Sequence, residues 1–308
     1  MTDNWKEYKK KQGKYFDKNS SSLHILSGDK KLNLFEKILW LIFNFINNYF
    51  NKSFIDKNLE NCVYNPKKEL FFSFHNSKNS SPSRILCNQF LIDMDLKRIT
   101  RNFDKIKILE IGCGRGHQIE IFDEIFGENY SYLGIDPHRS ENWDRLSSEK
   151  IKFSEDTYLN LNKYFNDCNI ILSQSVLEHL DQDMLLFKNI SDHVNSSKKK
   201  IINIHFFPSV ACYYTYRGHG IRQYQKHTIS KLTKYFSKNT KKQIYYLGSD
   251  NLNKLHKKKF GRGIFFNQDN ISDHDYYEEI KKNLKGNNFT LKEPSFYGLC
   301  LMSNLESL

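Results

Sequence analysis

Three glycines alternate with other residues at the end of an apolar run, Ile-Leu-Glu-Ile-Gly-Cys-Gly-Arg-Gly at residues 108–116. Without Cβ atoms, Gly112, Gly114 and Gly116 let the main chain pass close to a ligand and adopt dihedral angles that other residues resist. A tight turn that binds nothing would also use glycine. This pattern alone therefore leaves both interpretations open.

A carboxylate follows at the end of the next apolar run, Tyr-Leu-Gly-Ile-Asp-Pro at residues 132–137. Asp136 stands 24 residues after Gly112 (136 − 112), close to the separation at which an acid after the second strand reaches the ribose hydroxyls of a bound nucleoside. An Asp that only caps the turn before Pro137 would not account for the glycines. The two segments together predict a nucleoside-containing cofactor.

The glycine spacing separates two classes of cofactor. Dinucleotide sites use Gly-x-Gly-x-x-Gly, so that a helix N-terminus can meet a pyrophosphate. Here the third glycine comes one residue early, and His117 stands where that pattern requires glycine. Glu110, just before the loop, is unsuited to phosphates but suits a positively charged ligand. S-adenosylmethionine has a sulfonium, an ammonium and no phosphate, so it is favoured, and an NAD-dependent oxidoreductase is the alternative.

Short apolar runs alternate with amphipathic segments around these motifs. Strands are expected at residues 107–111, 131–135, 169–172 and 200–206, with helices at 118–126 and 183–194. Helices between β-rich runs indicate parallel strands with crossover connections, hence an α/β sheet covered on both faces. In such sheets small molecules bind beyond the carboxyl ends of the strands, where the glycine stretch stands.

The chain resembles the class I, Rossmann-like S-adenosylmethionine-dependent methyltransferases of the small-molecule or glycan type. The resemblance rests on Leu-Glu-Ile-Gly-Cys-Gly-Arg-Gly at 109–116, the acid of Leu-Gly-Ile-Asp at 133–136, and Ile-Leu-Ser-Gln-Ser-Val-Leu-Glu-His-Leu at 171–180. It implies a seven-stranded, mostly parallel sheet with helices on both faces. Final strands at residues 242–247 and 295–302 would pair antiparallel at the sheet edge.

Two further parts complete the expected architecture. Residues 1–80 form a partly helical N-terminal extension that could cap the substrate, and residues 81–308 form the cofactor-binding domain. The boundary follows from Ser81-Pro82, a typical helix start. An insertion at about residues 250–292 exceeds the normal connection length and is expected beside the acceptor site, with a helix from about 273 to 284.

The resemblance assigns cofactor contacts to nine residues. Glu110 would lie near the amino group of the methionine, and Asp136 would hold the ribose diol. Asp156 would accept a hydrogen bond from the adenine amino group, although an exposed loop acid is the alternative. The methionine and ribose portions would be lined by Gly112, Cys113, Gly114 and Gly116, and by Ser173 and Gln174 at the end of the fourth strand. No metal is expected.

A hydroxyl acceptor benefits from a general base with a pKa near neutrality, and histidine supplies one. The candidates are His179, His205 and His219, with a structural role as the alternative for His179. Substrate contacts are expected in a loop rich in aromatic and guanidinium groups, which could stack on a sugar and bind an anionic group. Its candidates are Tyr216, Arg217, Arg222 and Tyr224, and a structural loop is the alternative.

The composition restricts partners and location. The net charge of +12 comes mainly from scattered lysine runs that favour solvated faces over a nucleic-acid surface. Six cysteines without Cys-x-x-Cys spacing argue against zinc and disulfides and favour a reducing cytoplasm. The N-terminus lacks the pattern of a signal peptide.

One segment raises the question of membrane contact. Residues 38–46, Ile-Leu-Trp-Leu-Ile-Phe-Asn-Phe-Ile, are apolar but far shorter than the roughly 20 residues of a membrane span. A core helix, or one covering a substrate site, is favoured, and an interfacial membrane helix that makes weak peripheral contact is the alternative.

The sequence therefore predicts a cytoplasmic methyltransferase that transfers the methyl group of S-adenosylmethionine to a hydroxyl, rather than a nitrogen, of a small-molecule or sugar-containing acceptor. One alternative is an RNA methyltransferase, which only the basic charge supports. Another is a methyltransferase-like domain that binds without turnover.

Overall fold

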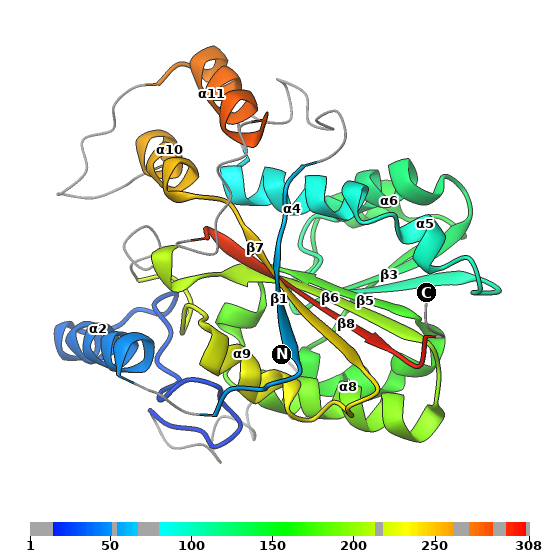
Figure 1. Ribbon diagram of the computed structural model, residues 1–308, viewed down its shortest axis with the longest axis horizontal. Helices are drawn as coiled ribbons and strands as arrows, with labels where there is room; N and C mark the ends of the chain where they lie inside the picture. Colours follow the sequence, from blue (N-terminus) through cyan, green and yellow to red (C-terminus); the bar gives the residue numbers. More distant parts are fainter. Residues whose placement is uncertain are drawn as a thin grey trace.

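The computed structural model describes residues 15–50, 54–66, 80–212, 218–260, 271–285 and 294–305. Its centre is one eight-stranded sheet in the order β1-β7-β8-β6-β5-β2-β3-β4 (Figure 1). The strands are β1 (Leu59–Val63), β2 (Ile106–Ile111), β3 (Tyr130–Asp136), β4 (Ile151–Glu155), β5 (Ile170–Gln174), β6 (Ile201–Pro208), β7 (Lys241–Leu247) and β8 (Phe296–Ser303). All neighbours pair in parallel except β8, which is antiparallel to β6 and β7.

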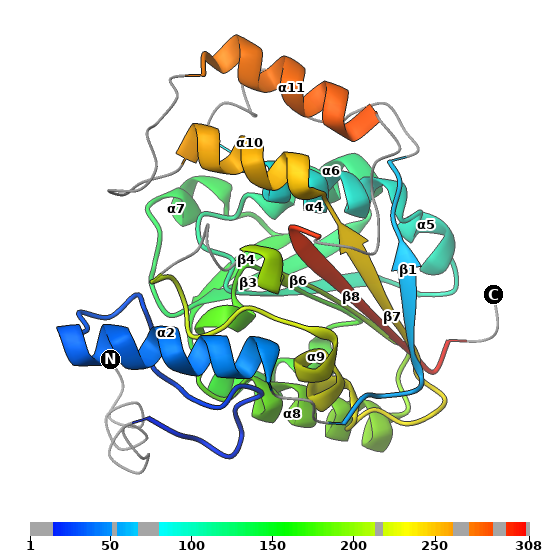
Figure 2. The same cartoon turned by 60° about the vertical axis from the view of Figure 1, so that its left-hand side comes forward.

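Helices cover both faces of the sheet (Figures 1 and 2). The α-helices are α2 (Leu34–Tyr49), α4 (Pro82–Asp93), α5 (Leu96–Ile99), α6 (Gln118–Phe126), α7 (Asn142–Leu146), α8 (Asp183–Ser197), α9 (Lys226–Thr233), α10 (Asp250–Phe260) and α11 (Asp273–Lys285). In Figure 1, α4, α5 and α6 lie above the sheet with α10 and α11 farther out, while α8 and α9 lie below it. The predicted α/β class is confirmed.

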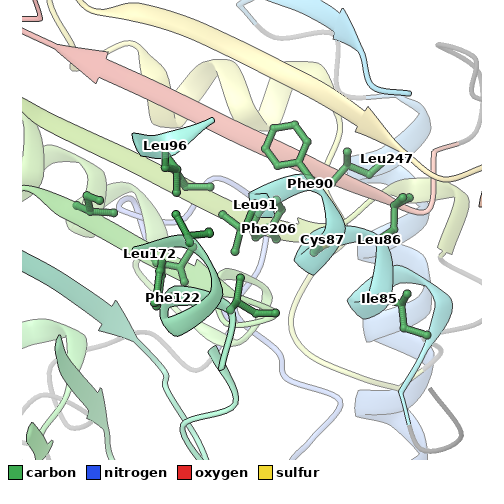
Figure 3. Packing of buried hydrophobic residues seen from close by; sticks show 14 of the residues in the cluster. Ile85, Leu86, Cys87, Phe90, Leu91, Leu96, Phe122, Leu172, Phe206 and Leu247 are labelled. Atoms are coloured by element: carbon green, nitrogen blue, oxygen red, sulfur yellow. The ribbon is translucent and has the colours of Figure 1, made fainter. Parts of the chain in front are cut away.

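Alternating strand residues fill a separate hydrophobic core on each face, as the two-residue period of a strand requires. In β2, Ile108 packs with the cluster under α4 and α6, whereas Leu109 and Ile111 pack with the cluster over α8 and α9. Figure 3 shows the first cluster, in which Phe90 of α4 and Phe122 of α6 lie close to the strand side chains. Both clusters hold β2 firmly, and the end of β2 carries the glycine stretch.

The predicted helix start at Ser81-Pro82 is confirmed in detail. The side chain of Ser81 accepts a hydrogen bond from the amide of Arg84, and Pro82 occupies the first turn of α4. A side-chain acceptor and a residue without an amide hydrogen both suit the N-terminus of a helix, where the first amides lack partners.

The sheet has one strand more than the seven expected. β1 comes from the N-terminal extension and pairs in parallel with β7, so β1 rather than the last strands forms this edge. A buried ion pair fixes it there: the Lys242 ammonium lies 2.9 Å from the carboxylate of Asp56, just before β1. β7 and β8 pair antiparallel with each other as expected, but β8 lies inside the sheet, between β6 and β7.

α2 does not form part of either core. Its apolar residues Ile38, Ile42 and Phe45 are about half exposed, whereas Trp40 and Asn44 on its other side are buried. Of the two interpretations favoured for residues 38–46, the core helix is therefore wrong, and the helix that covers a substrate site stays a prediction. No helix in the part of the chain described above has the length and apolarity needed to cross a membrane.

Candidate functional site

The glycine loop joins the carboxyl ends of β2 and β3. The amides of Gly112 and Cys113 donate to the Ile135 carbonyl at 2.7 and 3.1 Å. The amide of Gly114 donates to the Asp136 carboxylate at 3.0 Å. The two strand ends predicted to meet are therefore in direct contact, and each carboxylate oxygen keeps capacity for a further donor.

The three glycines serve different purposes, although all have positive φ angles, of 71°, 51° and 77°. A Cβ on Gly112 would lie 2.3 Å from a methyl group of Val176, so this glycine allows the turn after β5 to pack on the loop. A Cβ on Gly116 would lie 3.0–3.3 Å from Leu146, Phe153 and Ile119. A Cβ on Gly114 would meet nothing within 4 Å, so only Gly114 borders open space.

Two aromatic side chains fix the loop from the side away from β5. The indole nitrogen of Trp143 donates to the Gly114 carbonyl at 2.7 Å, and its ring stacks on Phe153 with 5.1 Å between centroids. Cys113 points into this wall, because a Cβ on Gly134 would lie 2.8 Å from its sulfur. The Cys113 side chain thus packs against β3, so only the backbone of Cys113 is left to line a ligand site.

Glu110 lies under the loop and is 3% exposed. The hydroxyl of Tyr132 donates a hydrogen bond to its carboxyl group. Burial raises the pKa of Glu110 to about 8, the Tyr132 hydrogen bond opposes this rise, and the charge of Asp136 adds to it. A cation bound beside these two carboxyl groups would favour the ionised form of Glu110.

Unpaired polar atoms lie at the carboxyl ends of β2 and β5. Gln118 at the start of α6 donates to Gln174 at the end of β5, which leaves the second amide atom of each side chain buried without a hydrogen-bond partner among the described residues. Buried amides normally have partners, so two orphan atoms at the strand ends fit a polar ligand group. Together with the open side of Gly114 and the acid Glu110, they fit the methionine end of S-adenosylmethionine.

Two predicted cofactor residues have other partners. The Asp156 carboxylate accepts from the amide of Thr157 at 2.8 Å and from the side chains of Asn160, Tyr164 and Lys163. Burial would raise its pKa, but these donors lower it to about 2. The Ser173 hydroxyl is fully buried and faces His205, so only its backbone borders the strand end. The adenine contact of Asp156 stays a prediction.

His205 is unsuited to proton transfer with a substrate. It is fully buried in β6, its Nδ1 lies 2.8 Å from the Ser173 hydroxyl, and Phe187 packs on its ring. Burial lowers the pKa of His205 to about 3. The prediction that it could be a general base is therefore wrong.

His179 and His219 meet at a residue that was not predicted. Asp29, from the N-terminal extension, lies 2.7 Å from Nδ1 of His179 and 3.1 Å from Nδ1 of His219. The amide of Gly220 also donates to Asp29 at 3.0 Å. The two imidazole rings are edge to face, 4.7 Å apart between centroids. The two histidines are separate candidates in the sequence, and the structure places them together.

Asp29 in this cluster is exposed, both histidines are partly buried, and the contacts among them shift the pKa values of Asp29 and His179. Burial lowers the pKa of His179, but the hydrogen bond with Asp29 and the charge of buried Glu178 outweigh it, so the pKa of His179 is raised. Burial raises the pKa of Asp29, but the hydrogen bonds with His179 and His219 outweigh it, so that pKa is lowered. An imidazole held by a carboxylate is the arrangement of a general base. The three donor atoms lie within 4.8 Å of one another, so the group could also hold a cation.

The substrate-loop prediction is corrected at two residues. Arg222 and Tyr224 are fully buried. The Arg222 guanidinium pairs with Asp183 at 3.1 Å and donates to the carbonyl of Leu180 at 2.7 Å. The Tyr224 hydroxyl donates to Asp183 at 2.9 Å. Their contacts are structural, and Tyr216 and Arg217 lie outside the described residues.

The buried Arg222 assembles the histidine cluster. Its guanidinium donates to the hydroxyls of Ser20 at 2.8 Å and Ser22 at 3.1 Å and to the Leu180 carbonyl, which ties the N-terminal segment and the loop after β5 to the loop after β6. Nearby, the amide of Gly28 donates to the Gly220 carbonyl at 2.7 Å. Three distant segments are thereby held together around Asp29.

The predicted insertion forms α10 and α11, and α10 also packs on α4. A hollow of about 780 Å³ between the two helices is lined by Lys254, Lys258, Glu278 and neighbouring residues. None of the strand-end or histidine residues described above lines it. We therefore place the candidate site at the strand ends, where the glycine loop, Glu110 and Asp136 lie.

No protein-family model matches the sequence, and no curated protein matches it significantly. Among solved structures, the chain is similar to the plantazolicin methyltransferase BpumL in complex with a triazolic desmethylPZN analog and SAH, with 14% identity, coverage of 71% of this chain and 85% of that chain, and a TM-score of 0.42. It is similar to a SAM-dependent methyltransferase from Archaeoglobus fulgidus, with 16% identity, coverage of 75% and 96%, and a TM-score of 0.40.

A third similar structure is a phosphoethanolamine N-methyltransferase 2 from Haemonchus contortus, in complex with phosphomonomethylethanolamine and S-adenosylhomocysteine. The identity is 11%, the coverage is 76% of this chain and 60% of that chain, and the TM-score is 0.41. At such identities and TM-scores these structures carry no conclusion about function, which is drawn below from the residues of this chain.

Proposed function

We propose that the chain is an S-adenosylmethionine-dependent methyltransferase that binds its cofactor across the carboxyl ends of β2 and β3. The observation that carries the proposal is the contact of the Gly114 amide with Asp136 beside open space, above the buried acid Glu110. Bare main chain and two carboxyl groups suit a nucleoside with positive charge and no phosphate.

Each of these residues has a role in holding the cofactor. Asp136 keeps lone pairs for the ribose hydroxyls. When bound, S-adenosylmethionine supplies a methyl group already activated on a sulfonium. Most of the acceleration then comes from positioning the acceptor and excluding water, which rigid strand ends favour.

The acceptor proton is assigned to the Asp29–His179 pair. His179 follows β5 directly, in the short helix η3 (Leu177–His179), at the same edge of the sheet as the glycine loop. Asp29 at Nδ1 holds the ring and stabilises the imidazolium that forms when Nε2 takes a proton from a hydroxyl. A positioned base suits a hydroxyl acceptor, because the hydroxyl must lose its proton as its oxygen is methylated.

The acceptor class remains the one predicted from the sequence, a small molecule or a sugar-containing compound. Arg222 no longer supports it, because that side chain is buried, so the support is the cluster of Asp29, His179 and His219. We place the enzyme in the cytoplasm, which fits its six free thiols. A domain that binds the cofactor without turnover would share the strand-end site but would not need the histidine pair.

Replacing Gly114 by Ala tests the cofactor site. The added methyl group meets no protein atom within 4 Å, so the fold bears only the strain of a positive φ, about 1 kcal/mol, while the methyl group enters the proposed ligand space. Gly127→Ala is the control for backbone strain: Gly127 also has nothing within 4 Å of an added Cβ and ends α6 away from the loop, and its φ of 60° with ψ of −126° makes Ala at least as costly to the fold there as at Gly114.

Calorimetric titration with S-adenosylhomocysteine should give binding to the wild type and to Gly127→Ala, and binding at least ~10-fold weaker to Gly114→Ala. Titration with NAD should give no heat. Heat with NAD alone, or equal affinity in the two variants, would contradict the proposed cofactor and its place.

A further inference from the structure

The outward side of α2 is apolar along the whole helix. We use the term apolar face for Leu34, Phe35, Ile38, Ile42, Phe45, Ile46 and Phe50, whose exposed fractions lie between 37% and 76%. Together they present on the order of several hundred Å² of apolar surface, which a monomeric protein rarely leaves in one patch without a binding role. Figures 1 and 2 both show α2 at the periphery of the molecule.

Hydrogen bonds on the other side of the helix fix this orientation. The buried side consists of Trp40 and three asparagines, residues 44, 47 and 48. The indole nitrogen of Trp40 donates to the Gly220 carbonyl, and the Asn44 amide donates to the Ile221 carbonyl, both at 3.1 Å. Rotating α2 to bury its apolar face would break these bonds. The exposure of the apolar face is therefore specified by the sequence.

Positive charge lies at the start of the apolar face. Lys30, Lys31 and Lys37 are exposed, and the carboxylate of Glu36 is engaged in capping the helix through the Asn33 amide. The whole chain carries a net charge of +12. Asp29 and Glu36 lie beside these three lysines, so the segment keeps an excess of positive charge. A second copy of the chain would bring the same excess, whereas anionic lipid headgroups match it.

We propose that α2 lies in the interface of an anionic lipid bilayer, with the apolar face among the acyl chains and Lys30, Lys31 and Lys37 at the level of the headgroups. With 16 residues the helix suits binding parallel to the surface. The proposal is independent of methyl transfer, because lipid binding can be measured without cofactor or acceptor.

The test is flotation of the full chain with vesicles of phosphatidylcholine alone or mixed with phosphatidylglycerol. The wild type should float with the mixed vesicles, less at high salt, and weakly with phosphatidylcholine alone. The double variant Ile42→Gln, Phe45→Gln should bind at least ~10-fold more weakly, because two large apolar side chains are lost from the interface. Val63→Gln, an exposed apolar residue of β1, is the matched control and should bind as the wild type does.

A second variant keeps the test decisive if the first one folds poorly. Lys30→Glu with Lys31→Glu should reduce binding to the anionic vesicles and leave binding to phosphatidylcholine unchanged. The proposal would be overturned if the Ile42, Phe45 variant floated as much as the wild type. It would also be overturned if the wild type floated with neither kind of vesicle. Light scattering that gives a wild-type dimer and a monomeric Ile42, Phe45 variant, without lipid binding, would assign the apolar face to a second copy instead.

Discussion

Replacing Glu110 by Gln tests whether the acid beneath the glycine loop is neutral in the folded protein. Burial raises its pKa from 4.5 to about 8. Because the pKa is raised in the folded state, the stabilisation from this group is fully present below its unfolded value near 4.5. It is lost as the pH rises through about 8.

The size of the effect follows from the two pKa values. A difference between 4.5 and about 8, at about 1.4 kcal/mol for each pH unit, corresponds to roughly 5 kcal/mol. Gln has the same length, cannot ionise and keeps an acceptor for the Tyr132 hydroxyl. We expect similar free energies of unfolding for both proteins near about pH 5 and a more stable variant near about pH 9, by up to roughly 5 kcal/mol.

Urea unfolding of both proteins across this pH range measures the difference, and Glu149→Gln, at an exposed acid, is the control that should follow the wild type throughout. A difference in stability between Glu110→Gln and the wild type that stays constant with pH would refute the reasoning. The cofactor adds a second observable. A bound cation that ionises Glu110 releases a proton near neutrality, so the heat of binding should depend on the ionisation enthalpy of the buffer in the wild type and not in the variant.

Two further predictions concern the histidine cluster and the network that assembles it. Asp29→Asn should lower the methyl-transfer rate and move the rising limb of its pH profile to lower pH, because the Asp29 carboxylate raises the pKa of His179. If a chelator abolished the activity of the wild type, the cluster would instead be a metal site. Asp183→Ala should lower the free energy of unfolding by about 3–5 kcal/mol in urea titrations, because it leaves the Arg222 guanidinium buried without its carboxylate, and a loss below about 1 kcal/mol would contradict that reasoning.

Elements with a clear period were predicted from the sequence. The helix at 118–126 has the bounds of α6, and the glycine run and Asp136 meet as their spacing required. These features depend on local pattern: an amphipathic helix, a buried strand, and a turn that only glycine tolerates. The pattern also predicted the contact between two strand ends, because parallel neighbours end at the same edge of a sheet.

β1 could not be predicted in this way. Its five residues, Leu-Glu-Asn-Cys-Val, have only Leu59 fully buried, so they show neither alternation nor a continuous apolar run. The strand depends on the Asp56–Lys242 ion pair and on the free edge of β7, both of which need residues about 180 positions away. The position of α2 was wrongly predicted for the same reason. Its apolar run indicated a core helix, but hydrogen bonds of Trp40 and Asn44 to distant residues turn the apolar side outward.

The prediction that Arg222 contacts the substrate failed for a related reason. Residue type suggests an exposed guanidinium ready for an anionic substrate, since arginine is rarely buried without partners. Here three carbonyl groups, two serine hydroxyls and the Asp183 carboxylate supply those partners, and they come from two parts of the chain, residues 20–22 and 177–183. Sequence spacing carries no information on such a convergence, which explains why Asp29 was missed as well.

The position of Asp29 has a consequence for the N-terminal extension. The segment before α2 contributes Asp29 to the cluster with His179, and its residues 19–22 bond to α8 and to Arg222. Removing it would leave the Arg222 guanidinium and the Asp183 carboxylate buried with fewer partners, which is costly in the interior of a protein. We therefore infer that this segment folds together with the sheet, so that the group assigned to orient the base forms only when the whole chain has folded.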